Sequence, residues 1–216
     1  PIANGLITRM SERHDLNYGT MRLCGSIGFM LMTICGGAAW ERFGFHAMFL
    51  TAGLSFLLVF FVAFQLEDPP TPYVQHRQHA LWDLRQDAGF VVLIIASFFV
   101  GIALGFSMVF DGLYMKFFGG RERLIGLMFG VAALSELPAM QYRDAFTRRL
   151  SGPRTLWLSY ILLCIAYGGY VFARSPWMLL VIAIVKGFGF GLFLVSTIRL
   201  ASERAPEHWS STVQSV

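Results

Sequence analysis

Six long apolar stretches run through the sequence, and they restrict the possible fold more than any other feature. They cover residues 21–39, 45–66, 88–115, 124–142, 155–172 and 177–200. Each is close to the roughly 20 residues that a helix needs to cross about 30 Å of hydrocarbon. The stretches are continuous and lack the alternation of apolar and polar residues that the strands of a membrane β-barrel show. The sequence therefore predicts an all-α membrane protein with about six complete transmembrane helices.

The composition agrees with a membrane protein and argues against other classes. Hydrophobic residues make up 56% of the chain and charged residues only 14%, whereas soluble domains carry about 25% charge. The net charge of +4 does not indicate nucleic-acid binding, because the basic residues lie in short polar segments and form no stripe beside stacking aromatic residues. Three cysteines lie in apolar stretches without a C-x-x-C pair, so we interpret them as packing residues. They are Cys24, Cys35 and Cys164.

No pattern in the sequence indicates catalysis or metal binding. His76 and His79 lie in a polar segment without a cysteine nearby, as expected of a solvated loop. No serine lies in a G-x-S-x-G turn. We therefore predict a protein that is not an enzyme and that has no catalytic residue, no metal site, no cofactor and no nucleic-acid partner.

The connections between the apolar stretches predict a linker and an orientation. Most are short, but residues 67–87 are polar and contain Pro69, Pro70 and Pro72, which is typical of a linker between two groups of helices. More Lys and Arg residues fall on the side of this linker than on the opposite side, so the linker is predicted to be cytoplasmic. Because the chain begins at Pro1 without an initiator Met, we expect it to be a piece of a longer protein.

Two charged residues inside the apolar stretches are predicted to pair. A central lysine in a membrane helix is unfavourable by about 2.5–3.5 kcal/mol, so Lys186 needs compensation. On the predicted topology, Asp111 and Lys186 lie at depths that differ by less than about 10 Å, a gap that a lysine stem and helix tilt can close. The pair either rearranges during function or only fixes the register of the helices.

A third charged residue, Glu136, lies roughly 18 Å from the outer end of its stretch, near the middle of the membrane. Burial favours the neutral form of a carboxylic acid, so Glu136 could bind and release a proton. Pro138 follows it and is expected to kink the helix. The glycines after Lys186 permit close or sliding contact between helices, which makes them candidates for gating or packing. They are Gly187, Gly189 and Gly191.

The sequence resembles the major facilitator superfamily, whose members have twelve helices in two halves of six. The stretch NYGTMRLCGSIGF at residues 17–29 is similar to the start of the fifth helix in the branch that contains lactose permease, nucleoside permeases and phenylpropionate-permease-like proteins. The segment RRLSGPR at residues 148–154 resembles a basic cytoplasmic loop of the superfamily. The resemblance implies a helical bundle of this type, from the tail of helix four to the start of helix eleven.

This alignment divides the chain into three parts. Residues 1–66 would form the end of the N-terminal half, with helices four to six. Residues 67–87 would form the cytoplasmic linker, and residues 88–216 most of the C-terminal half, with helices seven to ten and the start of eleven.

The resemblance also implies roles for the charged residues. Arg22 matches an arginine that contacts the sugar in lactose permease, and Asp111 and Lys186 match an aspartate and a lysine that pair there. Glu136 resembles a glutamate that acts in substrate recognition and coupling. Arg22 and Glu136 are therefore the predicted substrate-binding residues, and Glu136 is the predicted proton-coupling residue.

Three positions depart from the lactose permease pattern. A histidine and a glutamate of the tenth helix are replaced by Gly189 and Leu192, and a carboxylate of the fourth helix is replaced by Asn4. If protons are coupled, Glu136 then carries more of that task.

These observations together predict a secondary active transporter. It would move a small organic solute, a sugar, nucleoside or aromatic carboxylate, together with protons by alternating access. It would be a monomeric multi-pass protein of the lipid bilayer, in a cell membrane such as the bacterial inner membrane. The alternatives are a transporter-like solute sensor or scaffold without transport, and a membrane enzyme whose reactive groups lie outside this chain.

Overall fold

Helices make up nearly all of the chain that the structure describes. The structure is a computed structural model and describes residues 18–64, 87–141 and 152–204. Within these ranges there are five helices and no strand. They are α2 (Tyr18–Ala63), α4 (Ala88–Phe117), α5 (Glu122–Gln141), α7 (Gly152–Phe172) and α8 (Pro176–Arg204). All five are long and apolar enough to cross a membrane, so the predicted all-α membrane fold is confirmed.

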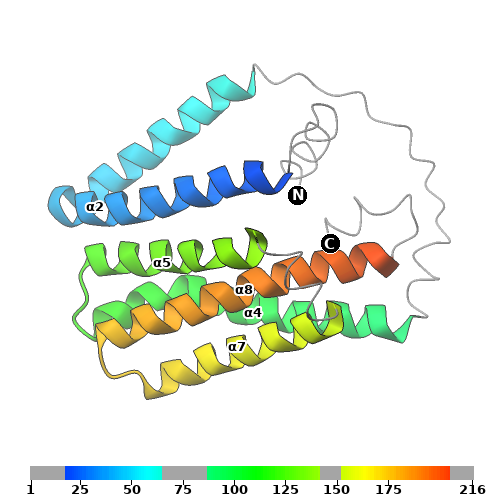
Figure 1. Cartoon of the computed structure of the whole chain (residues 1–216). Coiled ribbons are helices and arrows are strands. Elements are labelled where there is room, and N and C mark those ends of the chain that lie inside the picture. The colour runs from blue at the N-terminus through cyan, green and yellow to red at the C-terminus, as the bar shows by residue number, and fades with distance from the viewer. Residues whose placement is uncertain (1–17, 65–86, 142–151, 205–216) are drawn as a thin grey trace.

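The helix α2 contains the first two predicted transmembrane stretches. Gly44, inside α2, has φ 77° and ψ 178°, a left-handed conformation that favours glycine. At Gly44 the chain turns back on itself, which gives α2 a first limb over residues 18–43 and a second limb over residues 45–63 (Figure 1). The six predicted stretches therefore correspond to two limbs and four helices.

Local sequence signals set several helix boundaries. Asp87, which we assigned to the linker, is the N-cap of α4, and its Oδ1 accepts a hydrogen bond of 2.9 Å from the Gly89 N–H. The helix α8 begins at Pro176, whose fixed φ suits the first turn of a helix. The rest of the predicted linker, part of the predicted basic loop and the predicted start of helix eleven lie outside the described residues.

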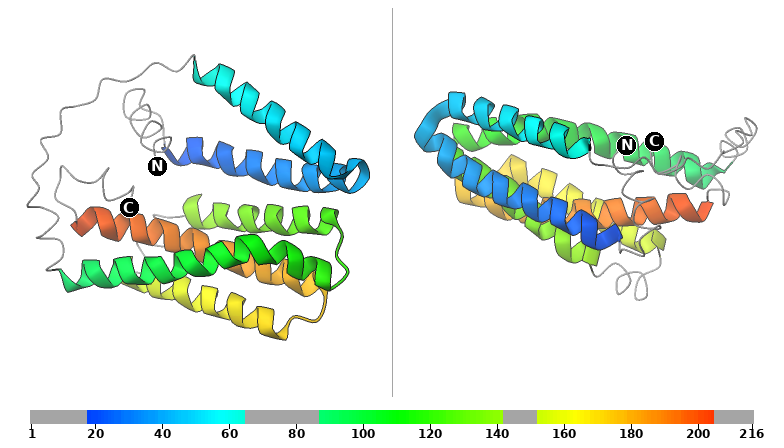
Figure 2. Two further views of the ribbon diagram at one scale, coloured as in Figure 1. Left: turned by 180° about the vertical axis from the view of Figure 1, so that it is seen from behind. Right: turned by 90° about the horizontal axis from the view of Figure 1, so that it is seen from above.

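Successive helices run in opposite directions, and α8 lies between α5 and α7 (Figures 1 and 2). The bend at Gly44 and the connections at residues 118–121 and 173–175 lie at one end of the bundle, here called the turn end. The helix termini at Ala63 and Ala88 lie at the opposite end, here called the linker end.

The core lies around α8, the most enclosed helix. Its buried side chains come from α4, α5, α7 and α8, and none comes from the second limb of α2. The main cluster contains Met115, Met128, Ala166, Leu179 and Ala183. The second limb of α2 leans away from α5 in Figures 1 and 2 and exposes most of its apolar side chains.

A polar network between α4, α7 and α8

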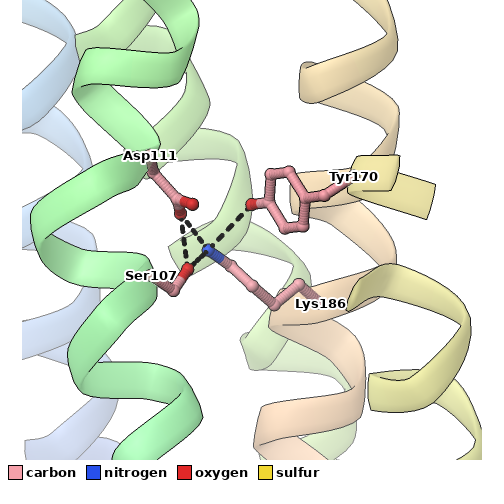
Figure 3. Close-up of polar contacts among 4 residues, drawn as sticks. All are labelled: Ser107, Asp111, Tyr170 and Lys186. Carbon is pink, nitrogen blue, oxygen red and sulfur yellow. Dashed lines mark hydrogen bonds and ion pairs between the residues drawn. The ribbon is translucent and has the colours of Figure 1, made fainter. Parts of the chain in front are cut away.

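Lys186 and Asp111 lie in contact at the centre of the helix bundle. Lys186 on α8 forms an ion pair with the Oδ2 atom of Asp111 on α4 (Figure 3). Both residues are buried, with 8% and 4% of their surface exposed. The structure thus contains the ion pair that we predicted from the membrane depths of the two residues.

Two neutral side chains complete this network. The Ser107 hydroxyl donates to Asp111 Oδ2 over 2.7 Å, and it accepts a hydrogen bond from Lys186 Nζ. The Tyr170 hydroxyl on α7 accepts from Lys186 Nζ over 3.2 Å. A lysine ammonium has three N–H donors, and Asp111, Ser107 and Tyr170 supply three oxygen acceptors (Figure 3). Because every N–H donor of the ammonium has an acceptor, the free-energy cost of burying the charge is offset.

Aromatic rings position Tyr170 on the turn-end side of the network. The Tyr114 hydroxyl donates to the Tyr170 carbonyl over 3.0 Å, and the Tyr114 ring packs on Phe118 with centroids 4.9 Å apart. The Tyr170 ring presents its hydroxyl edge to Lys186, whose Nζ lies 5.7 Å from the ring centroid (Figure 3). Sequence reasoning missed Ser107 and Tyr170, although Ser107 precedes Asp111 by one helical turn and could have been found by that spacing.

Glu136 lies on α5, outside this network of four residues. Its side chain is half-buried. On α5, Gly126 faces α2 and Ala139 faces α8. At 100° per residue, Glu136 falls between these two faces and therefore borders the space between α2 and α8. Pro138 is exposed, and it removes one backbone donor within α5.

Arg22 lies in the first turns of α2. The structure describes the backbone of Arg22 but not its side chain, so it does not relate Arg22 to Glu136.

The three glycines after Lys186 lie against two different neighbouring helices. A Cβ atom on Gly187 would clash with the carbonyl of Ala132 on α5, and one on Gly191 would lie 2.9 Å from the Ala139 Cβ. A Cβ on Gly189 would instead lie 3.1 Å from the Leu162 Cβ on α7. Gly187 and Gly191, one turn apart, therefore allow α8 to approach α5 closely, and Gly189 does the same toward α7.

A second close approach joins α2 to α5. A Cβ on Gly126 would clash with the carbonyl of Thr33, and one on Gly37 would lie 2.8 Å from the Glu122 carbonyl. At the turn end, Glu41 on α2 accepts a 3.2 Å hydrogen bond from the Arg123 N–H and lies 3.5 Å from the Arg121 guanidinium. This contact between α2 and α5 was not predicted from the sequence.

No group of three or more His, Cys, Asp or Glu side chains that could hold a metal ion occurs among the residues of 18–64, 87–141 and 152–204.

Comparison with known proteins identifies the family. The model of the MFS_1 like family matches residues 2–216, almost the whole chain. The chain belongs to this family. The predicted resemblance to the major facilitator superfamily is confirmed at this level, and the narrower permease branch stays a prediction.

Two curated relatives of this family member cover nearly its full length. The maltose permease of Geobacillus stearothermophilus is 28% identical over 214 residues, which are 98% of this chain and 54% of the permease. The uncharacterized transporter YwbF of Bacillus subtilis (strain 168) is 20% identical over 213 residues, which are 98% of this chain and 53% of that protein. The chain therefore spans about half the length of the curated relatives it matches.

Proposed function

We propose that the protein is a secondary active transporter that moves a small organic solute across a cell membrane by alternating access. The observation that carries the proposal is the buried network of Lys186, Asp111, Ser107 and Tyr170. Ionisable residues inside membrane spans are rare and usually mark pathways for substrates, ions or protons. The family assignment supports the same function, because its two relatives are named a permease and a transporter.

The solute site in this proposal lies where α2 faces α5 and α8, between the two helical halves. Arg22 would bind a hydroxyl or carboxylate group, because a guanidinium suits either. Glu136 would bind a solute hydroxyl or a proton, and its half-buried position beside α2 and α8 supports that assignment. A sugar is the favoured solute because one relative is a maltose permease. The proposed branch is that of lactose permease, nucleoside permeases and phenylpropionate-permease-like proteins.

Alternating access requires contacts that differ between two conformations. The contact of α2 with α5 at Gly37 and Gly126, together with Glu41 and Arg121, lies at the turn end between the two proposed halves. The position of this contact supports a conformation in which the transporter is closed at the turn end and open at the linker end. Proton coupling further requires that protonation and solute binding favour the same conformation.

Transport by the full-length protein in liposomes tests the proposal. We expect maltose or another sugar to accumulate under an imposed pH gradient, with nucleosides and aromatic carboxylates as the other solutes to assay. Glu136→Gln should abolish accumulation while exchange without a gradient survives. Glu122→Gln is the matched control, because Glu122 lies on the same helix but at the turn end beside Lys116. Accumulation that survives Glu136→Gln would assign Glu136 a structural role.

The alternative function is a solute sensor or scaffold of the membrane. Saturable binding of one of these solutes without uptake in liposomes would support a sensor and refute transport.

A further inference from the structure

Five buried hydroxyl groups lack a hydrogen-bond partner within the described residues. Four of them lie in the half of the bundle toward the linker end, on Ser97 of α4, Tyr160 of α7, and Ser196 and Thr197 of α8. The fifth, on Tyr167 of α7, lies closer to the turn end. Buried hydroxyls in proteins are nearly always paired with protein atoms or with ordered water. Four orphans on three neighbouring helices therefore call for a common explanation.

A layer of leucines shows that the three helix faces converge. Leu93 on α4 and Leu200 on α8 form one buried cluster, and Leu156 on α7 packs against it. One helical turn further from the linker end, the same faces carry Ser97, Ser196 and Tyr160. Since residues four apart lie on one face of a helix, the hydroxyls of these three residues point into one shared region.

This region has space beside the hydroxyls. The helix α4 packs much less closely on α8 than α5 and α7 do. A polar site with several hydroxyls and room beside them fits water, which needs two to four polar partners.

We propose that Ser97, Tyr160, Ser196 and Thr197 form a hydrated pocket that is reached from the linker end. On α8, Leu192 lies between this pocket and Lys186 and has only 1% of its surface exposed. On α7, the buried Leu163 lies between Tyr160 and Tyr167. One apolar layer, formed by Leu163 and Leu192, therefore separates the pocket from Tyr167 and the network around Lys186. The inference does not depend on transport, since it concerns water and needs no solute.

Cysteine labelling of the full-length protein in membrane vesicles tests access to the pocket. Cys24, Cys35 and Cys164, together with any cysteine outside this chain, are first replaced by alanine, and Ser196→Cys is compared with Leu192→Cys. The two positions match in burial, with 1% exposed at each, and they lie one turn apart on α8. We expect a small hydrophilic methanethiosulfonate applied on the linker side to label Ser196→Cys at least tenfold faster. Equal rates would overturn the proposal.

The sign of a stability change gives an independent test. If water binds the hydroxyls, Tyr160→Phe and Thr197→Val remove hydrogen bonds and lower the Tm of the detergent-purified protein. If the hydroxyls are dry and unpaired, the same substitutions remove a desolvation penalty and raise the Tm. A raised Tm for both variants would refute a hydrated pocket even if labelling occurred.

Discussion

Breaking the ion pair of Lys186 and Asp111 should destabilise the protein far more than replacing both residues. Lys186→Met leaves the Asp111 carboxylate buried without its counter-ion, beside the Ser107 hydroxyl. Asp111→Leu leaves the Lys186 ammonium with Ser107 and Tyr170 as acceptors. Either single variant therefore leaves a buried charge with only neutral partners, so both should be costly.

The expected magnitude follows from the burial of the pair. Removing one partner of a buried ion pair typically costs about 3–5 kcal/mol, whereas replacing both by apolar residues is often neutral or stabilising. With 8% and 4% of Lys186 and Asp111 exposed, solvent cannot take over the role of a missing partner. We therefore expect each single variant to lose about 3–5 kcal/mol and the double variant to lose less than about 1 kcal/mol.

Unfolding of the purified full-length protein in mixed micelles, titrated with dodecyl sulfate, measures these free energies. The control is Lys116→Met, because Lys116 forms a 2.9 Å ion pair with Glu122 whose side chains are 43% and 31% exposed. An exposed pair contributes at most about 1 kcal/mol. A double variant whose loss equals the sum of the two single losses would refute the reasoning, since it would show that the two charges do not stabilise each other.

Three further predictions concern contacts around this network. Tyr170→Phe removes an acceptor of the Lys186 ammonium and should cost about 1.5–3 kcal/mol in the same unfolding assay. Tyr114→Phe should cost only about 1 kcal/mol, because the Tyr114 hydroxyl donates to a neutral carbonyl. Equal losses would contradict a hydrogen bond between Tyr170 and a charged group. Gly126→Leu should separate α2 from α5 and lower the Tm, whereas Gly105→Leu, with open space at its Cα, should leave it nearly unchanged; similar Tm values would argue against the close approach. Glu41→Gln should change stability by less than about 1 kcal/mol, and any loss should disappear in high salt, because the ion pair is at the surface; a loss that persists in high salt would indicate a buried role.

Periodicity and depth were enough to predict the helices and the ion pair. Continuous apolar runs have one stable solution in lipid, which is a helix. The costs of Lys186 and Asp111 in the membrane restrict each to a partner at similar depth, so pairing follows from counting residues. The bend at Gly44 falls in the gap between the apolar stretches 21–39 and 45–66, but the positive φ of this glycine leaves no trace in hydropathy.

The neutral members of the site could not be found in the same way. Serine and tyrosine are common in membrane helices, and placing a hydroxyl in the membrane costs much less free energy than placing a charge there. Hydropathy and charge therefore gave no reason to select Tyr170. Its role depends on how α7 is rotated against α8, which is set by packing. The different directions of Gly187 and Gly189 could have been predicted, because residues two apart point to opposite sides of a helix.

The order in which the two charges are synthesised has a consequence for biogenesis. Asp111 precedes Lys186 by 75 residues, so α4 leaves the ribosome before the lysine reaches the insertion machinery. Lys186 is the residue that most opposes partition of α8 into lipid. If α4 waits beside the translocon, its carboxylate can receive the lysine as α8 enters. The Asp111 side chain would then act first as an insertion aid for a later helix, before it serves the folded protein.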